Sequence, residues 1–302
     1  MNYSAKTQSP QNLEQGVGQT IEKRTWQGVE QTTEQSVEKR TEQSIGQTAQ
    51  QTIGQNIRQT IEQTMKTLKL GGMAKDWRNV KYRSPEQYMR ELLEIEVRER
   101  ETNRMTRLIK QAGFRTIKTL DSFIWKQGIE IPNTITRKEI EEAAFVKNKE
   151  NLMLIGAVGT GKTHLATAVA LSLCEKGRPV RFYTATGLAN ILQEKHQRGT
   201  LNNFMTSLRK VELLVLDEIG FISLHKEASE LLFQIVSDCY EQKSLIITSN
   251  LEFSQWNTVF GNDKLTAAMI DRLIHHSHIL VFSGTGHRLE ESMQRQRRGG
   301  VT

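Results

Sequence analysis

The segment GAVGTGKT, residues 156–163, has the spacing of a loop that holds the phosphates of a nucleoside triphosphate. Its glycines allow the tight turn that points successive backbone N–H groups at phosphate oxygens. Lys162 is placed to reach the β- and γ-phosphates, and the Thr163 hydroxyl is placed to bind Mg²⁺. The sequence therefore predicts ATP and Mg²⁺ as ligands, with the ATP-binding residues Gly156, Ala157, Val158, Gly159, Thr160, Gly161, Lys162, Thr163 and His164.

The flanking sequence favours this interpretation over a purely structural glycine turn. Residues 151–155 (NLMLI) form a short apolar run that is typical of a buried strand. Residues 162–175 have a helical pattern, which Gly177 and Pro179 bring to an end. Strand, glycine loop and helix therefore follow one another in the order that a phosphate-binding loop requires.

A second set of polar residues follows two other apolar runs. Asp217 and Glu218 come directly after the run at 212–216, where a carboxylate is costly unless it serves a cation or a hydrogen-bond network. We expect Asp217 to join the Mg²⁺ shell and Glu218 to activate a water molecule as general base, which favours hydrolysis over transfer to a substrate. Asn250 follows the run at 244–248 and is placed to hold that water, to sense the γ-phosphate, or to cap the next turn.

The elements that must position these residues alternate between strands and helices, which predicts an α/β fold with a five-stranded parallel sheet flanked by helices. Upstream of the sheet, Ser84, Pro85 and Gln87 mark the start of a helix that continues to about Gly113. A second helix is expected around residues 136–148. The predicted strands are residues 151–155, 179–183, 212–216, 244–248 and 279–282.

The chain divides into a low-complexity extension (1–65), a basic helical module (66–148), an ATPase domain (149–290) and a basic tail (291–302). The extension repeats tetrapeptides such as EQSV and GQTI, in which about one residue in four is apolar. Four residues turn 400° on an α-helix, so the apolar stripe drifts by about 40° per repeat and leaves any one face. We expect this extension to be disordered or a fluctuating helix.

The net charge is +7, and most of the excess lies in residues 66–150, which hold 19 basic and 13 acidic residues. Such a region attracts nucleic acid through its phosphates, although a solvated helical surface explains the charge equally well. Trp77 either stacks on bases or belongs to the core of the helical module. The predicted DNA-binding residues are Lys69, Lys75, Arg78, Lys81, Arg83, Lys195 and Arg198.

Several other classes of protein are disfavoured. The sequence has no apolar run long enough to span a bilayer and no secretory segment, so we expect a soluble, cytoplasmic protein. Cys174 and Cys239 stand apart and are expected to be buried, unpaired thiols. His275, His276 and His278 are too crowded to be three ligands on one helix face and have no evident cysteine or acidic partner, so no metal besides Mg²⁺ is expected.

The segments GAVGTGKTHLA, LLVLDEIG and IITSN together resemble the Walker A, Walker B and sensor 1 motifs of AAA+ ATPases. The segment LTAAMIDRLIHHSHIL and the leading LKLGGMAKDW narrow the resemblance to the IstB-like branch, over about residues 68–290. That resemblance implies an ATPase with a reduced lid that assembles as an ATP-dependent homo-oligomer on double-stranded DNA. It also implies that the assembly recruits a cognate transposase, which stimulates hydrolysis.

The same resemblance implies roles for two arginines. Arg272, in IDRLIHHS, matches the arginine finger that reaches the γ-phosphate of a neighbouring subunit, a role that suits its permanent charge and forked donors. A local role, in helix capping or an ion pair, is the alternative. Arg288 matches a sensor 2 residue, although Gly286 and His287 replace the Ser-Tyr pair that usually precedes it.

Three other functions remain open. A DnaC-like loader of a replicative helicase has the same ATP site and a different partner. A small-molecule kinase shares the first loop, but it needs an arginine-bearing lid and an acceptor pocket. A non-hydrolysing scaffold binds ATP and DNA and behaves in the same way with or without the Glu218 carboxylate.

Overall fold

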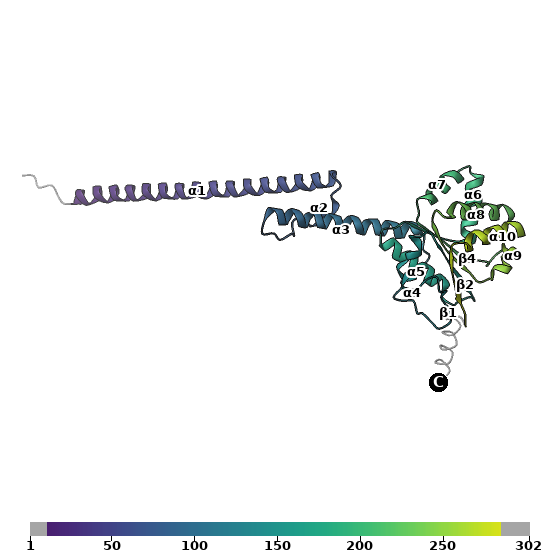
Figure 1. The fold of residues 1–302 in the computed structure, drawn as a ribbon. Coiled ribbons are helices and arrows are strands. Elements are labelled where there is room, and N and C mark those ends of the chain that lie inside the picture. The colour runs from purple at the N-terminus through teal and green to yellow at the C-terminus, as the bar shows by residue number, and fades with distance from the viewer. Residues whose placement is uncertain (1–10, 285–302) are drawn as a thin grey trace, which may run out of the picture. The chain divides into compact units, whose positions relative to one another are not determined.

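The structure is a computed structural model that describes residues 11–284, which form two compact units divided after Val97 (Figure 1). The first unit holds α1 (Gln11–Thr67), α2 (Gly71–Asp76) and the first half of α3 (Pro85–Ala112). The second unit holds the rest of α3 and the whole sheet. Within residues 11–284, no helix has both the length and the apolar character that a bilayer span requires.

The tetrapeptide extension forms the long helix α1. Of the two predicted forms, a disordered chain and a helix, the structure shows the helix. The described side chains of α1 include no buried residue, and Ile45, Ile53 and Ile57 are 63%, 58% and 54% exposed. This exposure agrees with an apolar stripe that drifts around the helix. Helical backbone without a buried face has little to stabilise it beyond its own hydrogen bonds.

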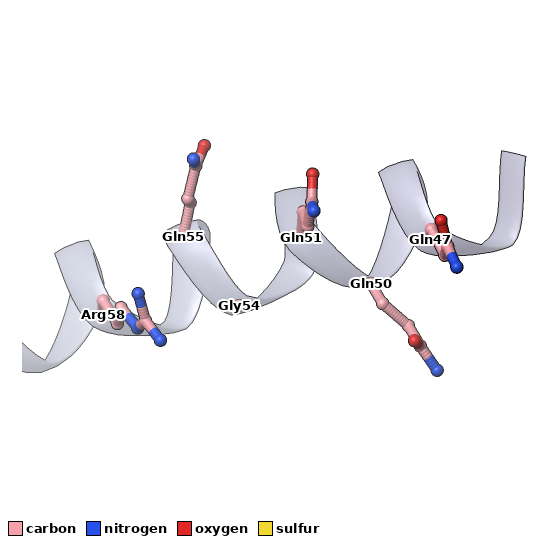
Figure 2. Close-up of a pocket in the computed structure, with 6 residues that line it drawn as sticks. All are labelled: Gln47, Gln50, Gln51, Gly54, Gln55 and Arg58. Carbon is pink, nitrogen blue, oxygen red and sulfur yellow. The ribbon is translucent and has the colours of Figure 1, made fainter. Parts of the chain in front are cut away.

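Figure 2 shows a hollow on α1 beside Gly54, where the helix lacks a side chain. All of the lining residues belong to this one helix, so the hollow has no opposing wall and opens to solvent. It offers no enclosed ligand site. The lining residues are Gln47, Gln50, Gln51, Gly54, Gln55 and Arg58.

Hydrogen bonds of a buried carboxylate organise the rest of the first unit. Glu96, on α3, accepts bonds from the backbone N–H groups of Gly72 (2.8 Å) and Met73 (3.2 Å) at the start of α2. A negative charge at that end of α2 also complements the helix dipole. The carboxylate therefore fixes α2 against α3.

The predicted start of α3 is confirmed, with one difference in its hydrogen bonds. The Ser84 hydroxyl accepts a bond from the Gln87 N–H (3.2 Å), as expected of an N-cap. The Gln87 side chain instead accepts from the N–H of Arg83 (3.1 Å), one residue before the cap. The helix ends at Ala112, and Gly113 follows with φ +84°, a conformation that suits glycine.

A six-stranded sheet of order β1-β6-β2-β5-β4-β3 forms the centre of the second unit. The five predicted strands are all present and mutually parallel, with ends that differ from the prediction by one to three residues. The sixth strand is β1, which pairs antiparallel with β6 and was missed because it has only two residues. The strands are β1 (Ile129–Glu130), β2 (Asn151–Gly156), β3 (Val180–Thr184), β4 (Leu213–Ile219), β5 (Ser244–Ser249) and β6 (Ser277–Phe282).

Helices cover both faces of the sheet, because alternate side chains of each strand point to opposite faces. Leu152 and Leu154 of β2 lie in a core with α5, whereas Met153 and Ile155 lie in a core with α6, α8 and α10. The helices between strands are α5 (Lys162–Glu175), α6 (Ala185–Gln197), α7 (Leu201–Arg209), α8 (Lys226–Cys239), α9 (Asn257–Phe260) and α10 (Asp263–Ile274). Short 3-10 turns at Ala144–Val146 and Phe253–Gln255 complete the unit.

Two predicted boundaries differ from the structure. The second upstream helix, α4 (Arg137–Glu142), starts at the capping box of Thr136 and ends early, because Ala143 turns left-handed with φ +55°. Residues 98–148 also fold with the second unit, and not with the upstream module. Leu108 and Ala112 of α3 pack in the same core as α5, which explains this division.

Candidate nucleotide-binding site

The predicted phosphate-binding loop connects β2 to α5 and depends on its glycines. Gly156 has φ +146°, and a Cβ there would lie 2.1 Å from the backbone oxygen of Phe282 on β6. Gly159 and Gly161 also have positive φ angles, of +82° and +103°. The close approach of β6 and these backbone angles therefore require glycine at positions that the motif specifies.

Lys162 is buried at the base of this loop, and its Nζ donates to the backbone oxygens of Gly156 (2.7 Å) and Ala157 (2.6 Å). Burial lowers the pKa of Lys162 to about 8, and the nearby Asp217 carboxylate acts in the opposite direction. When a triphosphate binds, charged phosphate oxygens replace the two backbone oxygens as acceptors of the Lys162 amine. This replacement favours the protonated form of the amine.

The depressed pKa of Lys162 predicts a pH dependence of ATP binding. Below pH 8 the amine is already charged, so affinity is flat; above pH 8 binding must take up a proton, and affinity falls by about tenfold per pH unit. Calorimetry at pH 9 in two buffers of different ionisation enthalpy measures the proton uptake, which is expected to be close to one. Lys162→Arg, which stays charged, is expected to remove the dependence; an unchanged profile would contradict the assignment.

Asp217 is 3% exposed and lies at the centre of a hydroxyl network. Its Oδ1 accepts from Thr163 Oγ1 (2.9 Å) on α5 and from Thr248 Oγ1 (2.6 Å) on β5. The Thr248 hydroxyl in turn accepts from the Glu218 N–H (2.9 Å). Carboxylate and hydroxyl oxygens are the ligands that Mg²⁺ prefers, so the pair predicted to hold Mg²⁺, Thr163 and Asp217, fits that ion.

Sequence reasoning missed Thr248 as a residue of this site. The strand order places β5 beside β4, and the residue at the end of β5 then faces the end of β4. The available signal was the polar TSN sequence that ends an apolar run, of which only Asn250 was assigned a role.

Replacing Thr248 by Val is expected to lower the free energy of unfolding by about 1–3 kcal/mol. The change keeps the shape of the side chain, but it leaves the part-buried Glu218 N–H without its acceptor and Asp217 with one donor fewer. Thermal denaturation measures the loss, and Thr248→Ser is the control because it retains the hydroxyl. Equal stabilities of the two variants would show that the network contributes nothing.

Glu218 adopts a left-handed backbone conformation, with φ +62°, at an irregularity in the β4–β5 pairing between Leu216 and Ile219. The irregularity turns the Glu218 side chain outward, where it is 47% exposed, while Asp217 stays buried. Strained backbone of this kind is concentrated at functional sites. The adjacent carboxylates therefore lie in different environments, one in a hydroxyl network and one open to water.

Arg115 is a second residue that the sequence did not point to. It follows the end of α3, and its Nη1 lies 4.0 Å from Glu218 Oε2, while its Nη2 lies 3.5 Å from Thr184 Oγ1. Both side chains of the ion pair are about half exposed or more, so solvent screens the interaction. The contact nonetheless places a cation beside the predicted general base.

Asn250 lies at the same edge of the sheet as Glu218. A Cβ on Gly220, two residues after Glu218, would lie 3.2 Å from Asn250 Oδ1. The neighbouring Ser249 hydroxyl donates to the backbone oxygen of Ile219 (2.8 Å) and so ties the ends of β4 and β5 together. The structure thus brings the predicted base and the predicted sensor residue to one place.

His164 is held by a segment upstream of the sheet. Its Nε2 lies 3.1 Å from Ser122 Oγ and 3.2 Å from the backbone oxygen of Thr119, and its ring packs edge-on against Phe123 at 5.3 Å. Phe123 also lies 3.4 Å from the Cβ position of Gly161. No pattern in the sequence predicted that this segment lies beside the phosphate-binding loop.

Arg272 lies on α10 and contacts α8 of its own chain. Its guanidinium donates to the Ser237 hydroxyl and lies over the Phe233 ring, with Cζ 4.6 Å from the ring centroid. These contacts lie within one chain but are neither the helix cap nor the ion pair named as the alternative, and the role in a neighbouring subunit stays a prediction. Arg288 lies outside the described residues.

The comparisons with known proteins agree with this geometry. Residues 63–295 match the family of IstB-like ATP binding proteins. The chain belongs to the IstB-like ATP-binding protein family. It is 33% identical over 205 residues to a Geobacillus stearothermophilus relative named for insertion sequence IS5376 and ATP binding, covering 68% of this chain and 81% of the relative.

A second IstB-like relative, from Pseudomonas aeruginosa and named for IS21, is 36% identical over 193 residues, which cover 64% of this chain and 71% of the relative. Among solved structures, the DnaC helicase loader is 23% identical, with 55% of this chain and 96% of that chain covered and a TM-score of 0.44. The predicted α/β fold, a mostly parallel sheet with helices on both faces, is confirmed, with a sixth, antiparallel strand beyond the five predicted.

In this IstB-like protein, the predicted DNA-binding residues lie on two separate units. Lys69, Lys75, Arg78, Lys81 and Arg83 are exposed on the first unit, and Lys195 and Arg198 lie at the end of α6.

Arg78 and Arg198 each form an ion pair. Arg78 pairs with Glu62 (2.6 Å) and Arg198 with Glu194 (2.9 Å). Trp77 is half-buried and its indole nitrogen is shielded from solvent, which favours the core role for this aromatic residue.

Proposed function

We propose that this IstB-like protein hydrolyses ATP and uses the ATP-bound state to assemble on double-stranded DNA and recruit a cognate transposase. The observation that supports it best is the meeting of Lys162, Asp217 and Glu218 at one edge of the sheet, with Thr163 and Thr248 bonded to Asp217. A site that only binds ATP has no need of an exposed carboxylate in a strained conformation beside a buried one.

Each residue of the site has a separate role in the proposed hydrolysis of ATP. The loop N–H groups and Lys162 bind the phosphates, and Asn250 orients the attacking water. Glu218 accepts the proton of that water at its carboxylate as the oxygen attacks the γ-phosphorus and the β–γ bond breaks. Bound Mg²⁺, held by Thr163 and Asp217, would neutralise charge on the β- and γ-phosphates.

The DNA and transposase steps rest on two further observations. The relatives with the matching sequence are named for insertion sequences, whose movement requires a transposase. Exposed cations gather on the first unit, where they are able to contact DNA phosphates. Hydrolysis then returns the assembly to a state with lower affinity for DNA and releases the subunits.

Light scattering of the purified protein with duplex DNA tests this proposal, in ATP and then in ADP. We expect large DNA-bound assemblies in ATP only, which persist longer in Glu218→Gln. Charge reversal at Lys81 and Arg83 is expected to weaken the assembly and its salt dependence, with Lys264→Glu on α10 as the surface control. A protein that stays monomeric in every condition would overturn the assembly step. Assemblies dispersed by a helicase, and not by a transposase, would favour the loader function.

A further inference from the structure

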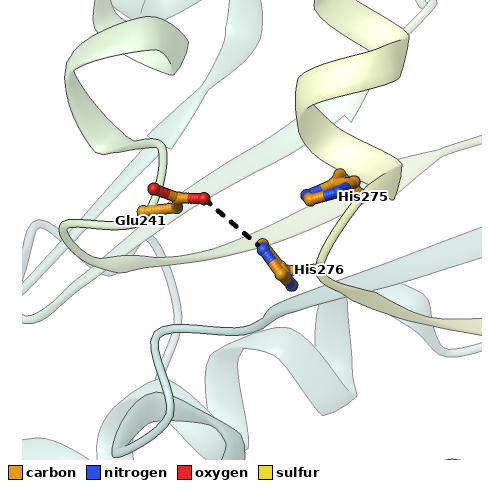
Figure 3. A group of neighbouring side chains, drawn as sticks. All are labelled: Glu241, His275 and His276. Carbon is orange, nitrogen blue, oxygen red and sulfur yellow. Dashed lines mark ion pairs between the residues drawn. The ribbon is translucent and has the colours of Figure 1, made fainter.

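Three side chains that can bind a metal lie together at a distance from the nucleotide site. Glu241, His275 and His276 each present one ligand atom, and these atoms all lie within 4.8 Å of one another (Figure 3). The Glu241 carboxylate lies 3.6 Å from His276 Nε2, and both side chains are about half exposed. The sequence showed no acidic partner for the histidines, because Glu241 is 34 residues away and the fold alone brings it near.

These residues lie at the opposite ends of the parallel strands from the phosphate-binding loop. Glu241 belongs to the turn before β5, and the two histidines belong to the turn before β6. Both turns lie at the amino ends of their strands, whereas Gly156, Asp217 and Asn250 lie at or after the carboxyl ends. The cluster is therefore a separate site.

A buried asparagine holds the two turns in place. Asn151, the first residue of β2, lies between them in the sheet. Its Nδ2 donates to the Leu273 backbone oxygen (3.1 Å), and its Oδ1 accepts from the Leu245 N–H (2.9 Å). Its own N–H donates to the backbone oxygen of His276 (2.7 Å). These bonds tie the backbone at the two histidines to the start of β5, the strand that follows the turn of Glu241.

A second-layer contact orients one of the imidazoles. The Tyr240 hydroxyl lies 3.0 Å from His275 Nδ1. Metal-binding histidines commonly use one ring nitrogen for such a hydrogen bond, which sets the tautomer, and the other nitrogen for the metal. His275 Nε2 thus remains for a ligand bond. His278 takes no part, because its two ring nitrogens lie 2.9 Å from Thr134 Oγ1 and 3.1 Å from Glu150 Oε2.

We propose that Glu241, His275 and His276 bind a divalent transition-metal ion of the Zn²⁺ class. Two imidazole nitrogens and one carboxylate suit zinc, with water as a fourth ligand. Ligand atoms about 2.0–2.1 Å from a tetrahedral ion lie roughly 3.3 Å apart, close to the 3.6 Å between Glu241 and His276. Bound zinc joins the turn after α8 to the end of α10 and so stabilises the folded state by mass action.

Calorimetric titration of the full chain with ZnCl₂, after treatment with a chelator, tests the site. We expect one ion per chain and a rise in melting temperature that MgCl₂ does not produce. His276→Asn and Glu241→Gln are expected to weaken binding by at least roughly tenfold, and Tyr240→Phe by a smaller factor. Circular dichroism of each variant without metal verifies that it folds.

His196→Asn is the matched control, because His196 pairs with Glu227 at 3.7 Å with similar exposure but belongs to no cluster of three ligands found among the described residues. Zinc binding that survives both His276→Asn and His275→Asn would overturn the proposal. An equal loss in His196→Asn would also overturn it, because the ion would then bind to surface histidines in general.

Discussion

Replacing Glu218 by Gln is expected to lower the rate of ATP hydrolysis by roughly 10²- to 10⁴-fold while leaving ATP affinity nearly unchanged. The Glu218 side chain is 47% exposed and pairs with Arg115, whereas Lys162 and Thr163 contact the loop backbone and Asp217. Removal of one carboxylate charge therefore removes the proton acceptor and retains the groups that bind phosphate. Phosphate release and fluorescent-nucleotide binding measure the two quantities separately.

Glu252→Gln is the control for this experiment, since Glu252 is an exposed acid two residues after Asn250. Its hydrolysis rate is expected to match that of the unchanged protein. Undiminished hydrolysis in Glu218→Gln would mean that another group activates the water. Loss of ATP binding would mean that Glu218 supports the shape of the site and does not act as the base.

Replacing Arg272 by Ala is expected to lower the rate of hydrolysis in the assembled state by roughly 10³-fold or more if it acts as an arginine finger. In a single chain, Arg272 contacts Ser237 and Phe233 of α8, so lost packing is a competing explanation of the fall. Ser237→Ala separates the two explanations. It removes the hydroxyl that Arg272 contacts in its own chain, and hydrolysis is expected to continue in this variant.

Mixing two inactive proteins tests the finger directly. Arg272→Ala retains an intact phosphate-binding loop, and Lys162→Ala retains an intact arginine. Hydrolysis that returns on mixing would require the arginine of one subunit to act at the loop of another. No recovery, together with a low rate in Ser237→Ala, would assign Arg272 a structural role within its own chain.

The parts of the site that the sequence predicted are those whose geometry is local. Gly156, Lys162 and Thr163 lie within one loop and one helix turn, so their spacing specifies their arrangement. The parallel strands were also predictable, because most of them are short apolar runs, whereas β3 alternates between buried and half-buried residues.

The parts that the sequence did not predict depend on the order of strands. Thr248 reaches Asp217 because β5 lies beside β4 in the sheet. Glu241 lies near His276 because the turns before β5 and β6 are separated by the single strand β2. The spacing of residues along the sequence does not reveal which strands are neighbours in the sheet. Arg115 likewise reaches Glu218 only through the path of the chain after α3.

The backbone angle of Glu218 also has a consequence for the evolution of this chain. Glycine adopts φ +62° without the cost that a side chain brings there, which is on the order of 1 kcal/mol. Relief of this backbone strain would therefore favour glycine at position 218, and selection for the carboxylate opposes that substitution. Copies of the gene that no longer need hydrolysis are expected to lose Glu218 early, and related sequences with glycine or asparagine there would mark lineages in which the activity has lapsed.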